Sequence, residues 1–150
     1  KRKYNMFTAD YTIRKYLINK LAVIVNLQYP SKASVDNSTM VYIGDSSVQR
    51  TQIAKANQIV NNQIVPSTIR NLCEFRVEFV AVGQSFKSAS DEIEKILEAL
   101  YTSGFFDELN QQLPMPLFNI RIEDSLMTTQ AEATETAYVH TQTLSFSYGE

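Results

Sequence analysis

Hydrophobic and polar positions alternate along several stretches of the chain. Residues 73–81 place apolar side chains at every odd position and charged ones at 74, 76 and 78. A period of two is typical of a strand with one face in the core and one polar face. The alternation returns over 117–124 and 136–149, and a shorter apolar run at 40–44 ends at a glycine. These stretches predict strands, most of them in the second half of the chain.

Two other segments have helical spacing. Apolar side chains recur at steps of three and four over residues 8–25 and again over 88–104, which is one face of a helix. In the second segment Ser88 or Ser90 would cap the helix, and Asp91 would lie where the helix dipole favours negative charge. Gly104 would end it in a left-handed conformation.

The order strand, helix, strand, strand in the C-terminal half predicts an α+β fold. We expect a mostly antiparallel sheet with two main helices packed on one face, in a single domain spanning residues 1–150. Turn-forming residues predict flexible segments near 31–39, 45–68 and 125–135. Within 51–65 the tetrapeptide Asn-Gln-Ile-Val occurs twice, and its β-branched composition favours an extended segment or hairpin over a helix.

Charge is unevenly distributed along the chain. Residues 1–90 carry twelve Lys/Arg and five Asp/Glu, whereas 91–150 carry two and eleven, so balances of +7 and −9 give the net −2. One interpretation is two solvated faces of different composition. The other is that a basic patch on one copy meets an acidic patch on the next, which closes rings or extends filaments. The candidate contacts are the basic Arg14, Lys15, Lys20 and Arg76 and the acidic Asp107 and Glu108.

Two adjacent phenylalanines leave a similar choice open. Phe105 and Phe106 follow the predicted helix end directly. Either they plug the end of the core, or they anchor a subunit interface, where large aromatic side chains carry much of the binding energy.

The residues that catalysis needs are scarce. His140 is the single histidine and Cys73 the single cysteine, which excludes multi-histidine metal sites, a histidine relay and an intramolecular disulfide. The four glycines are isolated, so no glycine-rich phosphate loop is present. We therefore predict that the protein is not an enzyme and uses no cofactor or metal.

Composition also restricts the partners. The chain has no apolar run near the length of a membrane span, so no membrane partner is expected. The missing apolar core of a signal peptide favours production in a reducing cytoplasm. The basic residues 1–3 predict at most transient, non-specific contact with DNA.

The order of elements resembles that of the tail terminator proteins of long-tailed bacteriophages, also called neck terminator or tail completion proteins. The similarity rests on the strand RNLCEFRVEFVAVG, the helix SASDEIEKILEALYTSG, the proline-bounded link LPMPLFNIRIED and the final strand YVHTQTLSFSYG, after a basic amphipathic helix. It covers residues 69–149 well, the first helix loosely and 45–68 not at all. It lies in pattern and length, with no invariant motif.

The resemblance implies an α+β sandwich whose copies form a six-fold ring on the tail tube. Such a ring ends tube polymerisation and offers a surface to the head connector. The implied partners are other copies, the tail tube protein and the connector or stopper protein, in a virion assembled in the host cytoplasm. Asp91, Glu94 and Glu98 would then face the channel through which DNA passes. No catalytic residues are implied.

Three alternatives remain open at this stage. The chain could form another ring of the neck or tail, such as a head-completion stopper, a tail-tube protein or a baseplate component. It could be a monomeric binding module that uses an exposed strand edge. A small hydrolase would need a nucleophile and a base that the sequence does not reveal.

Overall fold

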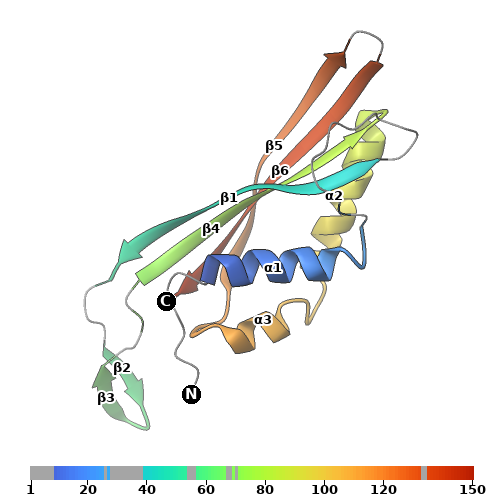
Figure 1. Cartoon of the computed structure of the whole chain (residues 1–150). Coiled ribbons are helices and arrows are strands. Elements are labelled where there is room, and N and C mark those ends of the chain that lie inside the picture. Colours follow the sequence, from blue (N-terminus) through green and yellow to red (C-terminus); the bar gives the residue numbers. More distant parts are fainter. Residues whose placement is uncertain are drawn as a thin grey trace.

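A computed structural model describes residues 9–25, 27, 39–53, 57–66, 69, 71–132 and 135–150. These residues form a sheet with helices on one side (Figure 1). The helices are α1 (Ala9–Leu21), α2 (Phe86–Leu100) and α3 (Asp107–Gln112), and the strands are β1 (Met40–Gln52), β2 (Asn57–Val60), β3 (Gln63–Pro66), β4 (Asn71–Gly83), β5 (Phe118–Glu132) and β6 (Glu135–Gly149). The predicted α+β class is confirmed.

The main sheet has four strands in the order β1-β4-β6-β5, and every neighbouring pair is antiparallel. β4 and β6 pair without a break from Leu72–Gly149 to Gly83–Tyr138 and form the centre of the sheet. β1 and β5 are its two edges. β2 and β3 form a separate hairpin beyond the ends of β1 and β4 (Figure 1).

The core lies between the sheet and the helices. The alternation in β4 directs Cys73, Phe75, Val77, Phe79 and Ala81 to the helix side, where all five are buried. β6 adds Leu144, Phe146 and Tyr148 to the same layer, and the helices contribute apolar stripes from Ile13, Leu17, Leu21, Ile93, Ile96 and Leu100. Each fully buried Val, Leu, Ile or Phe side chain contributes about 1.5–3 kcal/mol by leaving water, so this layer holds α1 and α2 on the sheet.

α2 begins one turn earlier than the sequence predicts. Ser85 is the cap, because its Oγ accepts from the backbone N–H of Ser88 at 3.1 Å, and the Ser88 hydroxyl completes a capping box. The prediction of Ser88 or Ser90 as the cap was therefore wrong, and Asp91 lies past the first turn. A Cβ on Gly83 would come within 2.6 Å of Ser88 Oγ, so the glycine leaves room for this cap. Gly104 has the expected positive φ, +85°.

β1 is longer than the apolar run at 40–44 predicts. It continues to Gln52, with a register shift between Ile43 and Ser46. Pairing with β4 supplies the hydrogen bonds that carry the strand through residues with turn-like composition. Strands therefore occupy most of 45–68 and 125–132, which the sequence suggested were flexible segments, while residues 31–38 lie outside the described part.

The hairpin expected within 51–65 is present as β2 and β3. Asn61 and Asn62 connect the strands with φ values of 52° and 61°. Two successive positive φ angles are those of a type I′ turn, which suits the twist of a hairpin and is tolerated by asparagine. The repeated Asn-Gln-Ile-Val thus forms the two arms of one hairpin.

Candidate functional site

β1 and β5 are the two edge strands of the main sheet. β5 spans fifteen residues and pairs only with β6 among the described strands, and β1 spans thirteen and pairs with β4. An isolated bridge from Leu27 to Val41 touches the free edge of β1 at one position. Open edges present unpaired N–H and C=O groups that can add a strand from another chain.

The basic candidates on α1 have different local roles. Arg14 donates from Nη1 to the carbonyl oxygen of Gly44 at 2.8 Å and to Ser46 Oγ at 3.0 Å. It therefore holds β1 at its register shift. Lys15 Nζ lies 5.9 Å from the ring centroid of Tyr11.

Lys20 and the predicted acidic contact Glu108 meet within one copy. Their Nζ–Oε1 distance is 3.5 Å, and both side chains are well exposed. Such pairs contribute about 0–1 kcal/mol and are screened by salt. Part of the charge complementarity expected between copies is therefore satisfied inside each copy. Asp107 is exposed at the start of α3.

Arg76 lies on the side of the sheet that carries no helix. It forms an ion pair with Glu123 of β5, and Arg121 reaches Glu74 at 3.2 Å on the same side. Ser145 Oγ donates to the second oxygen of Glu123 at 2.9 Å. These ion pairs connect β4 with β5 across the intervening β6, which helps to align the three strands.

Phe106 is buried in the core, whereas Phe105 packs against the core and is only partly buried. Phe106 is buried and packs edge-to-face on Phe146, with 5.6 Å between ring centroids. Phe105 is partly buried against Tyr16, whose hydroxyl donates to the Phe105 carbonyl. Phe106 is thus withdrawn from the surface. For this residue the structure agrees with the interpretation that it plugs the end of the core.

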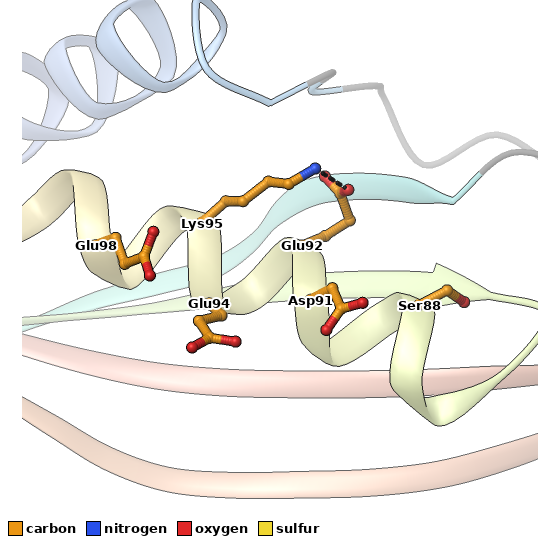
Figure 2. A pocket seen from close by; sticks show the side chains of 6 residues that line it. All are labelled: Ser88, Asp91, Glu92, Glu94, Lys95 and Glu98. Carbon is orange, nitrogen blue, oxygen red and sulfur yellow. Dashed lines mark hydrogen bonds and ion pairs between the residues drawn. The ribbon is translucent and has the colours of Figure 1, made fainter.

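The acidic candidates Asp91, Glu94 and Glu98 are exposed on the outer surface of α2 (Figure 2). Asp91 pairs with Lys87 at 3.0 Å, and the neighbouring Glu92 pairs with Lys95 at 2.8 Å. Glu94 and Glu98 have no ion-pair partner among the described residues. The three predicted carboxylates do lie on one helix face, as their spacing requires.

His140 is held between two serines that sequence reasoning did not connect with it. Ser90 Oγ of α2 lies 3.0 Å from Nδ1, and Ser125 Oγ of β5 lies 2.6 Å from Nε2. Burial lowers the pKa of the imidazole, so at neutral pH one nitrogen accepts from a hydroxyl and the other donates to one. Among the described residues, neither nitrogen contacts a carboxylate that would orient the ring as in a catalytic triad. Both ring nitrogens of the buried histidine therefore have a hydrogen-bond partner.

Sequence reasoning also missed an ionic cluster around the buried carboxylate of Glu150, at the far end of β1. Arg50 Nε donates to Glu150 Oε1 at 2.6 Å, and Arg50 Nη2 lies 3.0 Å from Asp10 Oδ1. The Glu150 side chain is 1% exposed. Burial and this carboxylate raise the pKa of the nearby Cys73 thiol to about 11, so Cys73 is a packed, unreactive thiol. One hundred residues separate the partners Arg50 and Glu150, and no local pattern connects them.

Exposed apolar side chains are the other feature that the sequence did not predict. On the β2–β3 hairpin they are Ile59, Val60 and Ile64, and on β5 they are Phe118, Ile122, Leu126 and Met127. Along β5 the expected burial of one face fails, because register shifts and the positive φ of Asn119 interrupt the alternation. Clustered exposed apolar residues are typical of interaction surfaces.

Within the described part of the chain, no group of three or more His, Cys, Asp or Glu side chains could hold a metal ion. None of the helices in that part is long and apolar enough to span a membrane. Comparison with protein-family models gives no match, and a search of curated proteins finds no significant relative. The sheet edges and their apolar neighbours are therefore the features from which a function can be argued.

Proposed function

We propose that the chain is a structural subunit that assembles edge to edge into a ring at the end of a phage tail tube. The carrying observation is the strand order β1-β4-β6-β5. Among the described strands none pairs with the outer side of β1 or β5, and only the Leu27–Val41 bridge touches the edge of β1. Two different edges on one subunit are what a head-to-tail ring needs. The location on a phage tail and the role of stopping tube growth are inferred from the resemblance to tail terminators.

Strand direction supports this assembly. Because each neighbouring pair is antiparallel, β1 and β5 run in opposite directions at the two edges. A second copy in the same orientation would bring its β1 beside β5 with antiparallel polarity. The alternation would then continue across the junction, and each junction would remove two exposed edges.

Charge pairs contribute less to this interface than the sequence suggests, because Lys20–Glu108 and Arg76–Glu123 are made within one copy. Backbone pairing and apolar contact would supply most of the association. Ring formation should therefore weaken only modestly when salt is raised.

Solution mass across protein concentration, with negative-stain imaging of the same samples, tests the proposal. Closed rings that also shorten growing tubes when added to tail tube protein would support a terminator. Long self-assembled filaments would reassign the chain to the tube itself. A monomer that neither forms rings nor caps isolated tubes would contradict the proposal and favour the alternative, a binding module with an exposed strand edge.

A further inference from the structure

The β2–β3 hairpin has an apolar face with nothing covering it in the described structure. Ile59 and Ile64 lie directly opposite each other in the hairpin register and are 76% and 73% exposed. Residues 57–66 carry no charged side chain. A two-stranded hairpin is marginal by itself and gains stability by packing against another surface.

The hairpin lies at one end of the sheet, on the β1 side. It follows the end of β1 at Gln52 and precedes the start of β4 at Asn71, and these two residues are paired. The register continues from Leu72 to Gly149 and from Ser147 to Phe118, where β5 begins. The hairpin and the start of β5 therefore lie at the same end of the sheet, on opposite edges (Figure 1).

The start of β5 carries a second apolar set. Phe118 is 39% exposed and Ile122 is 46% exposed, on a strand whose outer edge is unpaired among the described residues. By register Phe118 lies on the open face of the sheet and Ile122 on the helix side. The start of β5 therefore exposes one apolar side chain on each face of the sheet.

We propose that the β2–β3 hairpin of one copy docks on the start of β5 of the next copy, with Ile59 and Ile64 packing around Phe118 and Ile122. This rests on the proposed head-to-tail ring. In that ring β1 of one copy lies beside β5 of the next in antiparallel polarity, so the end of β1 and the start of β5 coincide. The hairpin attached to the end of β1 is then carried to the apolar start of the neighbouring strand.

A second copy fits this surface for two reasons. The uncharged hairpin can be buried without leaving an unpaired charge, and the apolar set that matches it is on this chain at the same level of the sheet. The docking contact lies beyond the end of β1, so it would add to the strand pairing between β1 and β5 without replacing it.

Cross-linking of paired cysteines tests the docking. Ile64→Cys combined with Ile122→Cys should give covalent dimers and higher ladders with a short bis-maleimide under ring-forming conditions. Val60→Cys with Ile122→Cys is the matched control, because Val60 pairs with Gln63 and points to the other face of the hairpin. The native Cys73 stays in place, since it is buried and its pKa is raised to about 11.

A substitution series gives the second measurement. Ile59→Ser with Ile64→Ser should raise the concentration for half-assembly by about tenfold or more, the effect of removing a central apolar contact. Val60→Ser should change it little. Measured at concentrations below assembly, the far-ultraviolet circular dichroism and the melting temperature should stay unchanged, because these side chains are exposed in the single copy.

The outcomes separate this docking from the proposed ring. Rings that form normally in the double-serine variant, together with no cross-link in the rings of the Ile64→Cys/Ile122→Cys variant, overturn the docking alone. Rings that form but no longer cap tubes also overturn it and assign the hairpin to the tail tube protein. A wild-type chain that does not assemble, together with no cross-link in the Ile64→Cys/Ile122→Cys variant, overturns both. Specific cross-links within long filaments uphold the docking and overturn the terminator role.

Discussion

Replacing Arg50 by methionine should destabilise the fold, because it removes the positive partner of the buried Glu150 carboxylate. The guanidinium is the partner of Glu150, whose side chain is 1% exposed, and it also reaches Asp10, which is 38% exposed. Methionine keeps much of the length and packing of the arginine stem. It leaves the Glu150 carboxylate buried and without a positive partner.

Breaking a fully buried pair by removing one partner costs about 3–5 kcal/mol. The Arg50 side chain is 30% exposed, so water already screens part of the attraction and about 2–3 kcal/mol is the better figure. The exposed contact with Asp10 adds roughly 0.5 kcal/mol. The sum, about 3 kcal/mol, corresponds to a melting temperature lowered by roughly 6–12 °C for a domain of this size.

Urea unfolding followed by circular dichroism at pH 7 measures this directly. The double variant Arg50→Met with Glu150→Gln is the control, because the amide keeps the shape of the carboxylate without its charge. It should recover more than half of the lost stability. A single variant that loses less than about 1 kcal/mol, or a double variant as unstable as the single one, would show that the burial of charge is not what Arg50 compensates.

Three further predictions concern α2, His140 and Cys73. That the α2 carboxylates face the DNA channel stays a prediction. Reversing Glu94 and Glu98 to lysine should slow DNA ejection without blocking assembly, and an unchanged ejection rate would contradict this placement. Burial lowers the pKa of His140 below its ordinary value of 6.5, so the unfolded chain binds the proton more readily. Stability should therefore fall as pH drops from 6.5 toward 5, and His140→Gln should flatten that part of the urea-midpoint profile; a slope retained in the variant would refute the assignment. With its pKa raised to about 11, Cys73 should react with a thiol reagent at pH 8 only as fast as the protein opens, and immediate labelling of the native protein would contradict its burial.

Local periodicity was enough to predict the central layer. The face of β4 that carries Phe75, Val77 and Phe79, and the buried stripe of α1, follow from spacing within each element. Such patterns are informative because the element's own geometry decides which side chains share a face. The antiparallel α+β arrangement follows from the order of those elements.

Contacts between distant elements could not be predicted in the same way. The second half of β1 contains Asp45, Ser46 and Ser47, which indicate a turn by composition, and only the pairing with β4 makes it a strand. The ion pair between Lys20 and Glu108 joins residues that the sequence assigned to opposite surfaces. In each case the deciding partner is far away along the chain, so tertiary context outweighs local preference.

The position of the α2 cap could not be predicted from residue type alone. Ser85, Ser88 and Ser90 all suit a helix start by type. The choice among them is made by the turn after β4, where Gly83 has no side chain to collide with the Ser88 hydroxyl. An alanine at Gly83 would therefore disturb a hydrogen bond that belongs to the next element.

The even number of strands in the main sheet has a consequence for stoichiometry. In the proposed ring, four strands per copy would let strand polarity match at every junction whether five, six or seven copies close the circle, so strand direction would not determine the number of copies. The number of copies would depend on the angle between neighbouring sheets. Sheet twist and the shape of the contacts at each edge determine that angle. Substitutions near the junction can therefore alter the diameter of the assembly while leaving the hydrogen-bonding pattern intact, and a population of rings of several sizes would be the visible sign of a junction whose angle is poorly defined.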